Sequence, residues 1–262
     1  MKKPLFFILF LLITVNVYAQ ELRIVSLAPN TTEILFVLGL GDSVVGVDEY
    51  SDYPEEARYI QRVGSFDRPD IENIILLKPD YILVNTDMVS DKKVYLEGLG
   101  IKFVNISPKN IEGLCKDIEM LGNIFNKQQA AGNITGDIRR RLKALSMKED
   151  KDRPKVFVQL FDDPLVTASS FIGDVIRVSG GKNVASDIKD DAGLFSMEEL
   201  INRNPDIIIA IGFSSESKIP SSVKAVKNNS IIKDLDPDIL LRPGPRIIDA
   251  IEALNRIFCE KS

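Results

Sequence analysis

The chain of 262 residues contains no histidine and only two cysteines, Cys115 and Cys259. The lack of histidine excludes a Ser-His or Cys-His catalytic pair, and it argues against a zinc or manganese site with imidazole ligands. A glycine-rich phosphate loop is also missing. The cysteines lie far apart without metal-binding or redox spacing, so they predict either one disulfide in an oxidising compartment or two buried thiols. These absences argue against most enzyme classes.

The N-terminal segment MKKPLFFILFLLITVNVYAQ has the pattern of a secretory signal. Two lysines are followed by an apolar run from Leu5 to Val15 and by the small-residue pattern Val17-Tyr18-Ala19. A retained membrane anchor is the alternative, but the apolar run is short for a spanning helix. No cysteine follows the run, so there is no site for lipid attachment. We expect residues 1–19 to be a signal peptide cleaved near Ala19 and the mature protein to be exported.

The chain is acidic, with a formal net charge of −5 that becomes −7 once the two lysines of the signal are removed. This charge disfavours nucleic acid or an anionic membrane as a partner. A mature chain of about 240 residues suits two smaller domains better than one large core.

Two segments more than a hundred residues apart share one pattern, DIENIILLKPDYILV at 70–84 and SMEELINRNPDIIIA at 196–210. In each, a glutamate precedes a Pro-Asp pair by the same spacing, and a run of mainly β-branched residues follows. The pattern predicts a helix stopped by the proline and then a buried strand, at Tyr81–Val84 and at Ile207–Ile209. Ser196 with Glu199 predicts a capping box. The chain therefore resembles two related α/β halves.

Other segments fit the same architecture. Asn30 and Glu33 have the spacing of a capping box at the start of a helix that ends at Gly39. The remaining predicted strands are Arg23–Leu27, Val44–Val47, Lys102–Ile106 and Val156–Leu160, and the remaining helices are Asp91–Leu99, Phe171–Val178 and Arg246–Phe258.

Residues 110–148 differ from both halves, because they keep helical periodicity and contain no proline. We expect two helices here, the second from Lys127 to Met147 and about 30 Å long. The predicted fold is α/β, with two Rossmann-like lobes joined by a single long backbone helix that limits their relative movement. The expected domains are the signal peptide, an N-terminal lobe at 20–109, a helical linker at 110–150 and a C-terminal lobe at 151–262.

Ordered motifs along nearly the whole mature chain resemble the periplasmic binding proteins of ATP-driven importers for vitamin B12, haem and ferric siderophores. The motifs are RIVSLAPNTTEILFVLGL, VGVDEYSDYP, VGSFDRPDIENIILLKPDYILV, SMEELINRNPDIII and RPGPRIIDAIEAL. Within this family, the chain most resembles the vitamin B12-binding proteins. The resemblance implies a helical-backbone binding protein with no intrinsic cofactor, which binds a small molecule and delivers it to permease subunits, and we expect a monomer in solution.

The resemblance also implies a role for the repeated glutamates. In this family a glutamate on the rim of each lobe docks into an arginine-lined pocket of a permease subunit, and Glu72 and Glu198 match those positions. Glu199 is the alternative if the register is shifted by one. Each glutamate could also simply stabilise the first turn of its helix through the macrodipole.

The ligand is expected between the lobes, where loops at strand ends converge. By resemblance to the vitamin B12-binding proteins, five residues match ligand-contacting positions: Tyr50, Phe66, Phe161, Asp238 and Arg242. The polar stretch Asn85, Thr86 and Asp87 follows a predicted strand and is added as a candidate. Aromatic rings suit the apolar face of a corrin, and Asp and Arg suit its rim of amides. Each of these roles has a structural alternative. Phe161 could be an ordinary packing residue, and Tyr50 or Tyr53 could pack over Pro54 in a turn. Asp238 and Arg242 could form a local ion pair.

The chain departs from that group in several ways. It has no tryptophan, Phe66 stands where the group has one, and Ser179 occupies one of its disulfide positions. A tyrosinate from Tyr50 or Tyr53 would suit haem, whereas an anionic ferric siderophore would need a more basic cleft than Arg68, Arg242 and Arg246 offer. A carboxylate-dependent exported hydrolase, using Asp162, Asp163 and Asp238, is a distant alternative. We therefore expect a periplasmic corrinoid-binding protein that is not an enzyme, with haem or a ferric siderophore as the alternative ligand.

Overall fold

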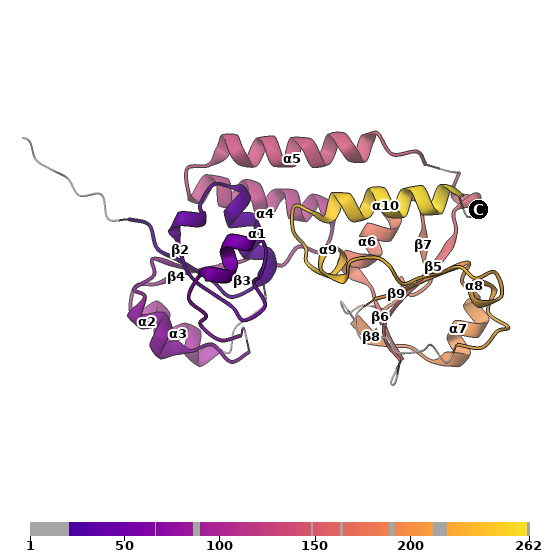
Figure 1. The fold of residues 1–262 in the computed structure, drawn as a ribbon, viewed down its shortest axis with the longest axis horizontal. Coiled ribbons are helices and arrows are strands. Elements are labelled where there is room, and N and C mark those ends of the chain that lie inside the picture. Colours follow the sequence, from indigo (N-terminus) through magenta and orange to yellow (C-terminus); the bar gives the residue numbers. More distant parts are fainter. Residues whose placement is uncertain are drawn as a thin grey trace, which may run out of the picture.

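Two α/β lobes lie side by side beneath a long helix in the computed structural model (Figure 1). The structure describes residues 21–65, 67–85, 90–147, 149–162, 165–188, 192–211 and 219–260. Within these ranges, no helix has the length and apolar character needed to cross a membrane.

The N-terminal lobe is built on a four-stranded parallel sheet with the order β2-β1-β3-β4. Because neighbouring strands run parallel, their carboxyl ends meet at one edge, where ligands of α/β proteins usually bind. The strands are β1 (Ile24–Ser26), β2 (Val44–Val47), β3 (Tyr81–Val84) and β4 (Lys102–Asn105), and the helices are α1 (Pro29–Val37), α2 (Ile71–Leu76) and α3 (Ser90–Gly98).

The C-terminal lobe has a mixed sheet with the order β10-β9-β5-β6-β8, and β7 also pairs with β5. The strands β9, β10 and β7 run parallel to their neighbours, whereas β6 and β8 are antiparallel to theirs. The strands are β5 (Lys155–Asp162), β6 (Leu165–Ala168), β7 (Lys182–Asn183), β8 (Ala192–Leu194), β9 (Ile207–Ala210) and β10 (Ile231–Ile232). The helices are α6 (Ser170–Val178), α7 (Met197–Arg203), α8 (Lys224–Lys227), α9 (Pro237–Leu241) and α10 (Ile247–Glu260).

The repeated Pro-Asp pairs play the same structural role in both lobes. Asp80 accepts a hydrogen bond from the backbone N–H of Arg23 at 2.8 Å, and its own N–H donates to the Arg23 carbonyl at 2.8 Å. Asp206 makes the same pair of bonds with Lys155, both at 2.8 Å. Each aspartate thereby aligns the strand that follows it with the first strand of its lobe.

The residue before each of these prolines also has the same backbone conformation. Lys78 and Asn204 both have φ of +47°, a left-handed conformation that ends a helix and turns the chain. The Ser196 hydroxyl accepts a hydrogen bond from the Glu199 N–H at 2.9 Å, which confirms the predicted cap of α7.

Two antiparallel helices connect the lobes, and the second extends over both (Figure 1). They are α4 (Ile111–Ile124) and α5 (Gln128–Lys143). The prediction of a helix to Met147 was too long, because α5 ends at Lys143 and has a length of about 24 Å at the standard rise. Beyond it, the Asn255 side chain of α10 donates to the Ser146 carbonyl at 2.8 Å, so a tertiary contact holds that carbonyl outside the helix.

The largest buried cluster is shared by the two lobes on the side that faces α5. It combines Ile34 and Leu35 of α1 with Ile118 of α4, Val156 of β5 and Leu254 of α10. Separate clusters lie on the opposite faces of the two sheets. The lobes are therefore packed together along the backbone helices.

The predicted capping box at Asn30 is wrong. α1 begins at Pro29, its N-cap is Ala28, and no side chain caps it. Proline is favoured at the first helical position, since its missing N–H would be unpaired there in any case. Asn30 therefore lies inside the helix, and Glu33 binds the other lobe.

Candidate functional site

A buried ion pair connects the lobes at the base of the cleft. Arg246, just before α10, donates to both oxygens of Glu33 in α1, at 2.9 Å from Nε and 2.6 Å from Nη2. The Glu33 side chain is 2% exposed. The Arg246 guanidinium also stacks on the Tyr53 ring at 3.8 Å from its centroid, and the hydrogen bonds to Glu33 raise the pKa of Arg246.

Arg242, four residues earlier, makes a second connection between the lobes. It contacts Asp52 of the N-terminal lobe at 2.7 Å and Asp238 of its own lobe at 2.8 Å. Glu33 lies 3.8 Å away. Partial burial of Asp52 acts to raise its pKa, but the hydrogen bond and charge of Arg242 outweigh it and lower the pKa. The local Asp238–Arg242 pair is therefore present, within a larger network of three carboxylates and two guanidiniums.

Hydrogen bonds with Arg62 and Asp48 hold the loop that carries Tyr50. Arg62 donates from Nη1 to the carbonyls of Asp48 and Ser51, at 2.8 and 2.7 Å. Asp48 is 1% exposed, and its carboxylate accepts from Ser51 Oγ and from the Tyr50 N–H. Burial raises the pKa of Asp48 despite these bonds. These hydrogen bonds hold the backbone of the loop, while the Tyr50 side chain is exposed to solvent.

A cavity of about 220 Å³ lies between the lobes, close to this network. Asn30 and Asn85 line it from the N-terminal lobe, where they follow the neighbouring strands β1 and β3. Its remaining lining residues are Ile106, Ser107, Pro108, Ser169, Phe171, Ile172, Leu241 and Pro243. Of the predicted ligand residues, Asn85 lines this cavity, and Arg242 lies in the chain between two of the lining residues.

Tyr50 and Phe161, the predicted ligand-contacting aromatic residues within the described ranges, are both exposed. Tyr50 is 61% exposed, and Phe161, near the end of β5 and opposite Val166 of β6, is 42% exposed. Exposed rings near strand ends can contact a ligand, but the structure by itself assigns none to them. Four further candidates lie outside the described residues: Phe66, Thr86, Asp87 and Asp163.

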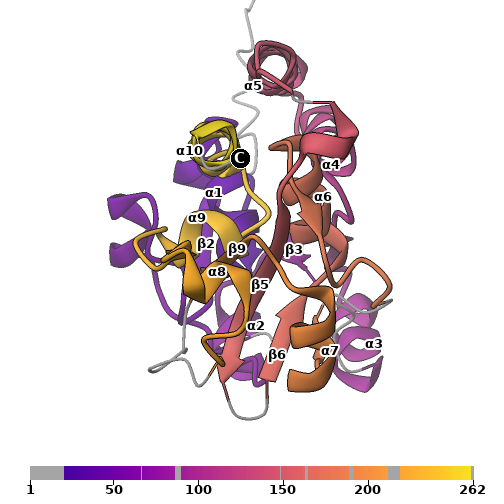
Figure 2. The same cartoon turned by 90° about the vertical axis from the view of Figure 1, so that its right-hand side faces the viewer.

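Glu72 and Glu198 occupy matching exposed positions in the first turns of α2 and α7. These helices lie one on each lobe, on the side away from α5 (Figures 1 and 2). Neither glutamate forms an ion pair with any residue in the described ranges. Glu199, in contrast, is bonded to Arg203 at 2.6 Å. Glu198 is therefore the better placed of the two adjacent glutamates for an external partner.

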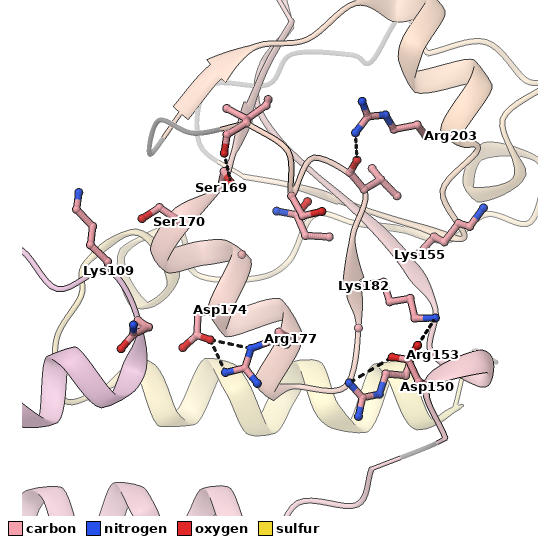
Figure 3. Close-up of a pocket in the computed structure, with 17 residues that line it drawn as sticks. Lys109, Asp150, Arg153, Lys155, Ser169, Ser170, Asp174, Arg177, Lys182 and Arg203 are labelled. Atoms are coloured by element: carbon pink, nitrogen blue, oxygen red, sulfur yellow. Dashed lines mark hydrogen bonds and ion pairs between the residues drawn. The ribbon is translucent and has the colours of Figure 1, made fainter.

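A larger pocket, of about 940 Å³, lies on the flank of the C-terminal lobe around α6 (Figure 3). Several of its basic side chains are paired with carboxylates: Arg177 contacts Asp174 at 2.5 Å, and Lys182 contacts Asp150 at 3.0 Å. Arg203 is similarly paired with Glu199. None of Tyr50, Asn85, Phe161, Asp238 and Arg242 lines this pocket. Size alone therefore does not identify the ligand site, and the smaller cavity between the lobes is the better candidate.

Three further sequence-based expectations concern a metal site, a disulfide and a pair of neighbouring carboxylates. Among the described residues there is no group of three or more Cys, Asp and Glu side chains arranged to hold a metal ion. Cys115 is buried in α4, and Cys259 donates from Sγ to the Ser146 carbonyl at 3.7 Å, so the two sulfur atoms are not bonded to each other. Asp162 accepts a hydrogen bond from Gln159, whereas Asp238 is paired with Arg242.

Comparison with known proteins identifies the family: residues 24–238 match the periplasmic binding proteins, and the chain belongs to this family. It is 31% identical to the vitamin B12-binding protein of Photorhabdus laumondii, over 91% of this chain and 88% of that protein. The crystal structure of the periplasmic vitamin B12-binding protein BtuF of Vibrio cholerae is similar, with a TM-score of 0.75, 29% identity and coverage of 91% of this chain and 97% of that one.

The periplasmic haem-binding protein HutB of Vibrio cholerae has the same fold, with a TM-score of 0.80, 23% identity and coverage of 91% and 99%. These relatives are substrate-binding proteins and not enzymes, so the hydrolase alternative is set aside. The chain is a binding protein of the vitamin B12, haem and siderophore type, for which the family implies an extracytoplasmic location, a permease partner and no cofactor of its own.

Sequence reasoning missed three members of the site: Asn30, Glu33 and Asp52. Asn30 and Glu33 were assigned to a helix cap, and Asp52 was considered only as part of a tyrosine-containing motif. The position of Asn30 shortly after the first strand was the available signal, since the segments that follow parallel strands at their carboxyl ends commonly bind ligands.

Proposed function

We propose that this protein captures a corrinoid, such as cobalamin, between its lobes and delivers it to an inner-membrane ABC importer. The main support is the 31% identity to a vitamin B12-binding protein over 91% of the chain. The proposed contacts with the ligand are made by Tyr50, Asn85, Phe161, Asp238 and Arg242. Phe66 is included because of its position in the sequence. A corrinoid has a broad apolar face and a rim of amides, which suit exposed aromatic rings beside polar side chains.

The charge at the cleft favours an uncharged ligand over an anionic one. Glu33, Asp52 and Asp238 face two guanidiniums, those of Arg242 and Arg246, so the network has one excess negative charge. A haem with two propionates, or an anionic ferric siderophore, would meet repulsion rather than complementarity here.

The proposal includes export and docking. Residues 1–19 would be removed as a signal peptide, and the mature protein would act as a monomer in the periplasm. Its lobes would comprise residues 20–109 and 151–262, joined by 110–150, and would move little relative to each other. Glu72 and Glu198 would each dock onto one permease subunit, so that two similar lobes match a two-fold symmetric importer.

The test is isothermal titration of residues 20–262 with cyanocobalamin, cobinamide, haemin and a panel of ferric siderophores. We expect tight one-to-one binding of a corrinoid that is weakened about tenfold or more by Tyr50→Ala or Arg242→Ala. Arg177→Ala, in the separate basic pocket, is the matched control and should bind normally. Binding of haemin or a siderophore without binding of corrinoids would overturn the ligand assignment and leave the transport role in place.

A further inference from the structure

Asn30 is a buried side chain without an internal partner. It is 2% exposed, yet neither its Oδ1 nor its Nδ2 has a hydrogen-bond partner in the part of the chain that the structure describes. Buried polar atoms in proteins are nearly always bonded, so such a side chain requires an explanation. Asn30 lines the cavity of about 220 Å³ between the lobes, which suggests that its partner comes from there.

The neighbouring polar side chains show that partners are not generally lacking in this turn. Thr31 bonds to the Ala28 carbonyl at 2.9 Å, and Thr32 bonds to Ser51 at 2.8 Å. Glu33 binds Arg246. Three of the four consecutive polar side chains are therefore satisfied within the protein, and Asn30 is the exception.

The opposite wall of the cavity is formed in part by the start of α6. Ser169, Phe171 and Ile172 at the start of α6 line it, and the first N–H groups of a helix have no partner within the helix. The Ser169 side chain does not cap them, and its hydroxyl donates instead to the Ile188 carbonyl at 2.9 Å. The cavity thus lies between the amino end of α6 on one side and the Asn30 amide on the other.

None of the described residues that line the cavity carries a charge. A carboxylate entering the cavity would meet no cation among these lining residues, and it has no proton to donate to Asn30 Oδ1. A primary carboxamide both donates and accepts, so it can satisfy both atoms of the Asn30 amide.

We infer that this cavity receives a primary carboxamide arm of the ligand, with Asn30 exchanging two hydrogen bonds with it. This inference rests on the proposed function, because a corrinoid carries amides around its rim whereas haem carries carboxylates. The volume fits this assignment, since sites for whole drug-sized ligands occupy about 300–1,000 Å³ and this cavity is smaller. Asn30 would then make the site select amide-bearing ligands over carboxylate-bearing ones.

The test compares the binding of cyanocobalamin with that of its monocarboxylic acids, in each of which one amide has been hydrolysed. We expect the wild type to bind at least one acid about tenfold more weakly than the parent compound. Asn30→Leu should weaken binding of the parent about tenfold and abolish this preference. Asn133→Leu, which changes an exposed asparagine of α5, should change neither.

A second readout separates ligand recognition from a structural role. Unliganded Asn30→Leu should melt at the same temperature as the wild type or higher, since it removes an unpaired buried polar group. A lowered melting temperature, or unchanged binding and preference in Asn30→Leu, would overturn the inference while leaving the proposed corrinoid function standing. A wild type that binds no corrinoid would overturn both.

Discussion

Arg246 and Glu33 are hydrogen-bonded across the two lobes through two contacts, at 2.9 and 2.6 Å. The carboxylate is almost fully buried, at 2% exposure. A buried charge is costly unless it is paired, so the two residues depend on each other more than an exposed pair would. This pair therefore fixes the relative position of the lobes at the base of the proposed ligand site.

The stability of the protein should reflect this dependence. Arg246→Leu leaves the Glu33 carboxylate buried and poorly compensated, so we expect a loss of about 3 kcal/mol or more in the free energy of unfolding. The double variant Glu33→Leu/Arg246→Leu should be more stable than Arg246→Leu alone, because no unpaired charge remains. Urea unfolding measures the stability of both variants. Arg140 is 75% exposed and forms a surface ion pair, so Arg140→Leu is the control. It should lower the free energy of unfolding by less than about 0.5 kcal/mol. Strict additivity of the two substitutions would contradict the coupling.

Docking to the permease should depend on Glu72 and Glu198 together. Exposed ion pairs contribute about 0.5–1 kcal/mol each at most, so Glu72→Ala/Glu198→Ala should weaken complex formation about 5- to 30-fold, mainly through a slower association rate. Ligand affinity should not change. Surface plasmon resonance with the reconstituted importer separates the rate constants.

Glu260→Ala is the matched control for docking, because this exposed glutamate ends α10 on the side of the molecule away from α2 and α7 (Figure 1). It should leave association unchanged. Equal association rates for wild type and the double variant would show that the two glutamates serve only the first turns of their helices.

Local sequence patterns were sufficient to predict most elements of the fold. Tyr81–Val84 and Val44–Val47 form strands as predicted, because a buried parallel strand requires a short run of β-branched and apolar residues between turn signals. The repeat also predicted correctly that two similar halves exist. The reason for the repeated Pro-Asp pair could not be predicted from the sequence. The hydrogen bonds between Asp80 and Arg23 and between Asp206 and Lys155 connect residues about fifty positions apart.

The cleft could be predicted only in part, because its contacts join residues that are distant in the sequence. Glu33 and Asn30 match a helix cap when read locally, and only the position of Arg246 in space shows that Glu33 has a different partner. Asp52 likewise becomes part of the site through Arg242, 190 positions away. Local patterns contain no information about such pairs.

The two cysteines should differ strongly in reactivity. Burial raises the pKa of Cys115 to about 11, so at about pH 8 only about one molecule in a thousand has a thiolate there. Cys259 is partly exposed and should react first with a thiol reagent. A native sample should show one fast thiol that is lost in Cys259→Ser, and a denatured sample should show two. No titratable thiol after denaturation would mean that the exported protein forms a disulfide.

The contact between Asp52 and Arg242 should make part of the stability depend on pH. The pKa of Asp52 is lowered from its ordinary value of 3.8, so the folded state binds fewer protons there than the unfolded state. The resulting stabilisation is present above the ordinary pKa and is lost as the pH falls through the lowered value. Because the Asp52 side chain is 45% exposed, solvent screening should limit the effect to about 0.5–1 kcal/mol.

Urea unfolding of the wild type and of Asp52→Asn, from neutral pH down to about pH 3, isolates this contribution. The difference between the two free energies of unfolding should be constant above about pH 5 and should shrink below about pH 4. Asp48 has a raised pKa and acts in the opposite direction, but it is present in both proteins and cancels in the difference. A difference that stays constant down to the lowest pH would show that Arg242 does not hold Asp52 in solution, and the ionic connection between the lobes at the cleft would then depend on Glu33 and Arg246.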